Sequence, residues 1–194
     1  MRYDLIIAGV GGQGILSIAT VIGRAAVQEG LHLKQSEVHG MAQRGGAVSS
    51  HFRLADRPIQ SDLIPLAGAD LILSMEPMEA LRYLPWLKPD GWLVTNSAPV
   101  ETIPDYPPAD RLRDAMKAVA HPIALDAVAL ARAGQSPRSV NMAVLGAASP
   151  CMPFSEPVWE AAIRAQFQRK GDDVVAANIR VFQAGQSEAR RLAE

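Results

Sequence analysis

Cysteine is almost absent from this sequence, which contains a single one, Cys151. One thiol cannot close an internal disulfide, and it cannot hold an iron–sulfur cluster, which takes about four thiolates. If the protein takes part in electron transfer, we therefore expect the metal to lie on another chain. His39 and His51 also lack a spaced set of His, Cys or carboxylate partners, so we predict no metal site.

The sequence also lacks an excess of charge of either sign: it contains 19 Lys and Arg and 20 Asp and Glu, which gives a formal net charge of -1. Without a broad positive field, we expect neither nucleic acid nor a membrane surface as a partner. The longest apolar runs, such as residues 5–10 and 124–131, fall far short of the roughly 20 residues that cross a bilayer. No basic region followed by an apolar signal core opens the sequence, so we expect a cytoplasmic protein.

Apolar residues make up 48% of the chain, enough to bury a core, and we predict a single domain over residues 1–194. Short apolar runs alternate with segments of helical periodicity, which predicts an α/β fold: a three-layer α/β/α arrangement around a mostly parallel, Rossmann-like sheet, with a helix-rich C-terminal half. We expect strands over residues 3–9, 31–35, 47–54, 70–75 and 91–96, and helices over 15–29, 77–84, 110–119, 126–133, 140–148, 156–168 and 173–192. We also expect an ordered loop over 36–46, a wetter face on the strand 47–54, and a long surface connection around the prolines at 99, 104, 107 and 108.

A glycine-rich turn follows the first predicted strand and opens the first predicted helix; it contains Gly9, Gly11, Gly12, Gln13 and Gly14. Such a turn lets a backbone approach a phosphate closely, and the helix N-terminus points unpaired N–H groups at the same place. A dinucleotide site normally adds an acid about 20 residues later, after the second strand. Here that region offers Lys34 and Gln35, and Glu37 lies in the predicted loop. The lack of an acid at the end of the second strand disfavours NAD, whereas Lys34 could bind a ribose phosphate. Alternatively, the glycines only permit tight packing of strand and helix. In either case we expect Gly11→Val to harm folding or ligand approach, because a tight turn that could need positive φ tolerates a branched side chain poorly.

A second constellation comprises Gln43, Arg44, Gly45 and Gly46, close to Glu37 and His39. Arginine offers a planar fork of donors for phosphate or carboxylate, although a salt bridge from Arg44 to Glu37 that braces the loop is the alternative. Asn96, Ser97 and Asn141 could line the same cleft, but asparagines more commonly cap helices. We find no nucleophile elbow, no P-loop lysine and no carboxylate pair, so the catalytic residues are unknown and the sequence offers binding groups alone.

Three segments together resemble one family: residues 9–15 (GVGGQGI), 37–46 (EVHGMAQRGG) and 141–147 (NMAVLGA). The chain resembles the gamma-type subunit or domain of the 2-oxoacid:ferredoxin oxidoreductases, and within that family it is most similar to the indolepyruvate type. The similarity runs from residue 4 to about residue 184, in the same order and without extra domains.

The resemblance implies a complex that decarboxylates a 2-oxoacid on thiamine diphosphate, passes electrons through iron–sulfur clusters to ferredoxin, and releases an acyl-CoA. It implies that a large partner subunit carries the thiamine and the clusters, that this chain binds no cofactor alone and is inactive alone, and that coenzyme A is a co-substrate. The glycine turn and Arg44 would suit the phosphates of coenzyme A. A small NADP-binding reductase that uses Lys34, and a purely structural docking subunit, are the alternatives.

Overall fold

The computed structural model describes residues 1–40, 46–100 and 105–193 of the chain. One six-stranded sheet has the order β2-β3-β1-β4-β5-β6. β1 pairs in parallel with β4, β4 with β5 and β5 with β6, whereas β3 runs antiparallel to both β1 and β2. The strands are β1 (Arg2–Val10), β2 (His32–His39), β3 (Ala47–Ala55), β4 (Ala69–Ser74), β5 (Leu87–Asn96) and β6 (His121–Leu125).

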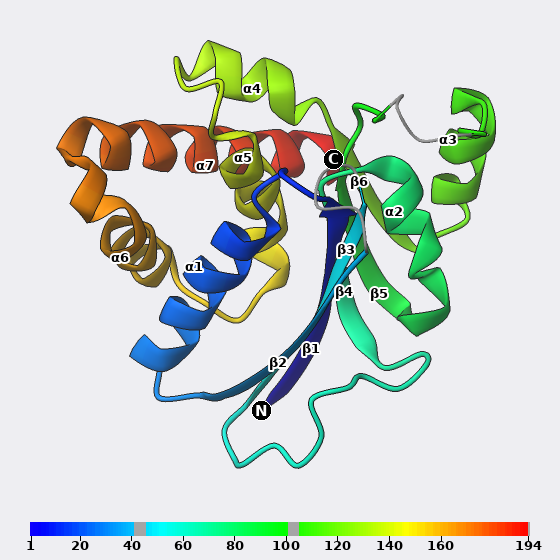
Figure 1. The fold of residues 1–194 in the computed structure, drawn as a ribbon, viewed down its shortest axis with the longest axis horizontal. Helices are drawn as coiled ribbons and strands as arrows, with labels where there is room; N and C mark the ends of the chain where they lie inside the picture. The colour runs from blue at the N-terminus through cyan, green and yellow to red at the C-terminus, as the bar shows by residue number, and fades with distance from the viewer. Residues whose placement is uncertain (41–45, 101–104, 194) are drawn as a thin grey trace.

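Helices cover both faces of this sheet, which confirms the predicted three-layer α/β/α arrangement (Figure 1). α1, α5, α6 and α7 lie on one face, and α2 and α3 lie on the other. The helices are α1 (Ile15–Gln28), α2 (Pro77–Arg82), α3 (Ala109–Lys117), α4 (Ala127–Ala133), α5 (Val140–Ala148), α6 (Glu156–Phe167) and α7 (Asp172–Ala193). Among the described residues, none of the helices combines the length and the apolar character that a membrane span needs.

β1 is the central strand, because its side chains are buried on both faces. Leu5 and Ile7 join the core beneath α1, α5, α6 and α7, while Ile6 and Ala8 join the smaller core beneath α2 and α3. This alternation follows from the two-residue period of a strand. A strand with two apolar faces must lie inside the sheet, which is the position that its sequence predicts.

β3 lies between β1 and β2, and because it is antiparallel to both, the strands that flank α1 run parallel to each other without being neighbours. Two expectations about the sheet were wrong. Residues 36–39 continue β2 instead of forming a loop, and residues 41–45 lie outside the described residues. The predicted wetter face of β3 is largely buried, because Ser49 packs inside and Arg53 forms a buried ion pair with Asp4.

The strand β6 was missed by sequence analysis. It has five residues, three of them exposed, and it contains Pro122. A short strand at a sheet edge that includes a proline carries almost no periodic signal, and edge strands are where proline is tolerated.

α5 and α7 approach each other so closely that only glycine fits at two positions. A Cβ added at Gly146 would lie 1.9 Å from the carbonyl oxygen of Phe182, and one added at Gly185 would lie 2.0 Å from that of Ala143. The obstacle in both cases is backbone, which cannot rotate away. The two helices therefore pack as one unit, and this unit positions the N-terminus of α5 beside the glycine turn.

Candidate functional site

The glycine turn lies at the carboxyl end of β1 and leads directly into α1. Gly12 and Gly14 have φ of +97° and +83°, in the left-handed region that favours glycine, and Gly14 is the N-cap of α1. Gly11 does not share this conformation, so the expectation that it could need a positive φ is not met. Its N–H donates to the carbonyl of Gly46 over 2.9 Å, which joins the turn to the end of the second glycine-rich segment.

Gln13 folds back and braces the turn. Its Oε1 accepts from the N–H of Val10 at 2.7 Å, and its Nε2 donates to the carbonyl of Met75 at 3.3 Å. A Cβ at Gly9 would lie 2.8 Å from the same Oε1, so the glycine makes room for the brace. Both polar ends of the Gln13 side chain therefore serve the shape of the turn.

Asn141, at the start of α5, is brought against the glycine turn. Its Nδ2 donates to the carbonyl of Gly14 at 3.2 Å, and a Cβ at Gly14 would lie only 2.6 Å from that nitrogen. Only 9% of Asn141 is exposed, so the contact is largely shielded from water. A residue 127 positions away thus helps to hold the turn.

Asn96 and Ser97 take different places. Asn96 is buried; its Oδ1 accepts from the N–H of Ala127 at 3.2 Å, and its Nδ2 lies 3.5 Å from the carbonyl of Met75. It thus binds the first N–H of α4, whose N-cap residue is Asp126, so its role is at a helix start, as the alternative interpretation held. Ser97 lines a separate cavity of about 510 Å³ beside Tyr106 and Arg113. Of the three predicted polar residues, only Asn141 lies at the glycine turn.

A cleft of about 520 Å³ opens beside the turn, between the start of α1 and the C-terminal helices. Two cations line it, Arg138 just before α5 and Lys170 just before α7, together with one acid, Asp173. The ammonium of Lys170 lies 5.6 Å from the ring centre of Phe167, a cation–π distance that helps to place it. α1 has no acidic residue in its first turn, so nothing on that helix opposes the positive end of its dipole. The cleft suits an anion.

The basic residues of this cleft were missed by sequence analysis. Arg138 and Lys170 lie more than 120 residues after the turn and belong to no glycine-rich motif. Only the return of the C-terminal helices across the sheet brings them there. The sequence signal closest to them is the predicted start of the helix at Val140, two residues after Arg138.

The second constellation is described only in part, because Gln43, Arg44 and Gly45 lie outside the described residues. The pairing of Arg44 with Glu37 therefore stays a prediction. The carboxylate of Glu37 contacts Nε2 of His39 and accepts from Nε2 of Gln35 at 3.0 Å. Within residues 1–40, 46–100 and 105–193, no group of three or more His, Cys, Asp or Glu side chains could hold a metal ion.

Lys34 lies at the wrong end of the sheet for a nucleotide on the glycine turn. Through β3 it is level with Asp4, near the start of β1, whereas the turn follows the end of β1. Its Nζ donates to the carbonyl of Gln60 at 3.2 Å. This placement argues against Lys34 as a partner for a phosphate at the turn.

Glu76 is a second feature that sequence analysis missed. Its carboxylate is fully buried, accepts from the N–H of Glu79 at 2.8 Å and from the hydroxyl of Tyr106. Burial and the bond to Glu76 raise the pKa of Tyr106, which keeps this hydroxyl protonated as the donor. The pair anchors the proline-rich connection against α2.

Comparison with known proteins gives one consistent match. The family described as "Pyruvate ferredoxin/flavodoxin oxidoreductase" matches residues 4–188. Indolepyruvate oxidoreductase subunit IorB of Thermococcus kodakarensis is 35% identical over 201 residues, covering 98% of both chains.

Two solved structures share the fold. The gamma subunit of a keto/oxoacid ferredoxin oxidoreductase from Geobacter sulfurreducens matches with a TM-score of 0.73 at 23% identity, covering 98% of both chains. The 2-oxoglutarate:ferredoxin oxidoreductase from Magnetococcus marinus, with 2-oxoglutarate, coenzyme A and succinyl-CoA bound, matches with a TM-score of 0.77 at 22% identity. The match covers 98% of the present chain but only 31% of that longer chain.

Proposed function

The chain belongs to the pyruvate ferredoxin/flavodoxin oxidoreductase family, and from this premise we propose that it is the accessory subunit of a thiamine diphosphate-dependent indolepyruvate or arylpyruvate ferredoxin oxidoreductase. The complex would decarboxylate a 2-oxoacid oxidatively, transfer the acyl group to coenzyme A and pass the electrons to ferredoxin. The choice of 2-oxoacid rests on the 35% identity to an IorB subunit over nearly the whole chain.

We assign thiamine diphosphate and the iron–sulfur clusters to a large partner subunit. A cluster needs several thiolates, and this chain has one cysteine. Burial raises the pKa of the Cys151 thiol to about 11, which disfavours the thiolate that binds iron. The residues of this chain therefore do not fit the role of cluster ligands, and its part in the complex is to bind and to orient.

The group that we assign to this chain is the phosphate portion of coenzyme A. The observation that carries this assignment is the cleft in which the start of α1 and its glycine turn face Arg138 and Lys170. Backbone N–H groups at a helix N-terminus and a guanidinium fork are both suited to phosphate oxygens. Coenzyme A bound here would be held by its charged end, and its thiol would be free to reach a reaction centre on the partner.

The test uses the complex of this chain with its large partner. We expect 2-oxoacid- and CoA-dependent reduction of an electron acceptor to require this chain. Arg138→Ala and Lys170→Ala should each raise KM for coenzyme A about tenfold, the effect of losing one charge-assisted hydrogen bond, and should leave KM for the 2-oxoacid unchanged. Arg111→Ala and Lys117→Ala, on exposed positions of α3, are the matched controls.

Two outcomes would contradict different parts of the proposal. Turnover that is unchanged when this chain is left out would refute the accessory role. Unchanged KM for coenzyme A in both cleft variants would refute the phosphate site and leave the accessory role standing.

A purely structural docking role is the second candidate, favoured by the internal use of the Gln13 and Asn96 amides. The variant Arg44→Ala separates the two roles. Assembly that stays intact while CoA-dependent turnover weakens would count against docking alone.

A further inference from the structure

β2 is an edge strand whose outer side is free of any described neighbour. The N–H of Gly40 donates to the carbonyl of Ala47 at 2.8 Å, just beyond the pair His39–Val48. Antiparallel pairs alternate between bonded and non-bonded, so the even-numbered residues of β2 bond to β3. The N–H and C=O groups of Leu33, Gln35 and Glu37 therefore point outward, where another strand could bind them.

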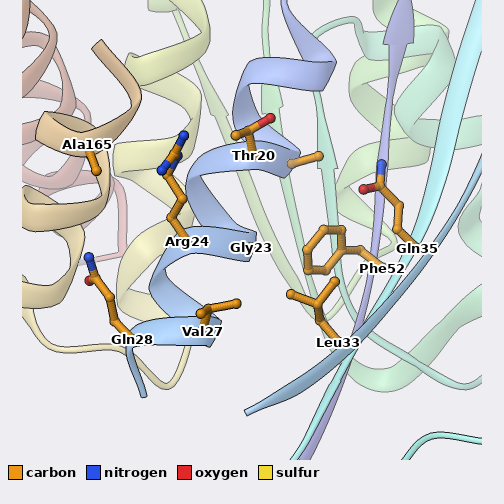
Figure 2. Close-up of a pocket in the computed structure, with 10 residues that line it drawn as sticks. Thr20, Gly23, Arg24, Val27, Gln28, Leu33, Gln35, Phe52 and Ala165 are labelled. Carbon is orange, nitrogen blue, oxygen red and sulfur yellow. The ribbon is translucent and has the colours of Figure 1, made fainter. Parts of the chain in front are cut away.

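A groove of about 490 Å³ with a mainly apolar lining runs beside this edge, between α1, β2 and α6, and the polar side chains of Arg24 and Gln28 also line it. In Figure 2, Leu33 and Phe52 face Gly23 and Val27 of α1 across the groove. Val27 is 66% exposed and Leu33 37% exposed, although both are large apolar side chains. The groove thus joins exposed apolar surface to unpaired backbone, the combination that binds an added strand.

Gly23 makes the groove deeper at a cost to α1. A Cβ at this position would lie 3.6 Å from Cζ of Phe52 and 3.8 Å from Cδ2 of Leu33, which are ordinary contact distances. No described residue therefore requires glycine at this position, and glycine within a helix costs about 1 kcal/mol relative to alanine. A ligand that enters the groove from outside would need the space that a side chain at this position would fill.

We propose that the β2 edge and this groove bind an extended segment of the large partner subunit, which adds to β2 as a strand and places an apolar side chain against Leu33 and Phe52. This inference rests on the proposed function, which supplies the partner. In the longer chain of the same fold, the matching domain makes up only 31%, so there the domain is joined to a much larger body in a one-to-one ratio.

A second copy of this chain fits the edge less well. Two-fold antiparallel pairing of β2 with itself, centred on Gln35 or on Ser36, would set Glu37 or His39 of the other copy opposite Leu33. Nε2 of His39 and the carboxylate of Glu37 already contact each other. Either pairing would set a charged or polar side chain of the other copy against the apolar Leu33, a poorer fit than an apolar side chain would make there.

The experiment measures the affinity between the full chain and the tagged large subunit. Val27→Lys and Leu33→Lys place a charge in the groove, and Gln35→Pro removes one outward N–H without removing a bond to β3. We expect each variant to weaken the complex at least tenfold. Leu63→Lys, on a leucine that is 56% exposed in the β3–β4 connection, is the control and should bind like the wild type. The melting temperature of each full-length variant checks that it is folded.

Each result decides between named alternatives. Folded groove and edge variants that bind the large subunit like the wild type would overturn the inference and leave the proposed function intact. Variants that convert a dimeric chain into monomers, yet still bind the large subunit, would assign the edge to a second copy and likewise overturn it. Wild-type chain that neither binds nor stimulates the large subunit would refute the proposed function itself.

Discussion

The same substitution, glycine to alanine, should change stability in opposite directions at two helix positions. Each change gains about 1 kcal/mol from helix propensity. At Gly23 the new methyl meets Phe52 at 3.6 Å, so the gain stands. At Gly146 the methyl would lie 1.9 Å from the Phe182 carbonyl, and α5 must move away from α7. Overpacking costs about 3 kcal/mol at its upper end, which leaves a net loss of about 2 kcal/mol.

Urea denaturation of the two variants and the wild type measures this difference. We expect the midpoint to rise for Gly23→Ala and to fall for Gly146→Ala, with unchanged slopes. The melting temperature should rise by about 2–4 °C in the first case and fall by about 4–8 °C in the second. Gly146→Ala with wild-type stability would refute the close packing of α5 on α7, and a destabilised Gly23→Ala would show that the groove does not have the space described.

Three further predictions concern single side chains. Arg53→Met should cost about 2–3 kcal/mol, because Oδ1 of the buried Asp4 carboxylate loses the N–H of Arg53 Nε at 2.9 Å, although Arg2 still donates to Oδ2; a loss below about 1 kcal/mol in urea denaturation would contradict it. Burial, reinforced by Arg53, lowers the pKa of His51 from 6.5, and its Nδ1 accepts from the N–H of Ile64. The unfolded chain therefore binds this proton more readily, so the melting temperature should decline as pH falls below 6.5, and His51→Asn should flatten that decline. Because the pKa of Cys151 is raised to about 11, alkylation by iodoacetamide at pH 8, followed by mass spectrometry, should be about a hundredfold slower in the native chain than in urea.

Local pattern predicted the fold class and most elements, because β1 is apolar on both faces and α1 has helical periodicity. The order of the strands in the sheet and the full length of β2 were harder to predict. Residues 36–39 contain only one apolar residue, Val38, and lie on an exposed edge, so little in the sequence marks them as strand. The position of β3 between β1 and β2 is a tertiary choice that no single segment encodes.

Only part of the candidate site was predicted from the sequence, namely the glycine turn at the end of β1 and Asn141. The glycine turn and Asn141 carry local signals, a glycine pattern and a helix start, and the structure brings them together. Arg138 and Lys170 reach the cleft through the crossing of α5 and α7, which depends on Gly146 and on a contact between distant backbones. Residues whose place depends on such a crossing cannot be found from spacing along the chain.

The bonds of Gln13 with Val10 and Met75, and of Asn141 with Gly14, lie within the chain itself. The shape of the turn is thus set by the chain's own bonds, so the phosphate binding proposed above would not cost the entropy of ordering backbone there. The flexible arms of Arg138 and Lys170 are the parts that must lose freedom on binding. The variants Arg138→Ala and Lys170→Ala should therefore make the entropy of binding measured by calorimetry less unfavourable, while the glycines act as a fixed template whose shape is set at folding.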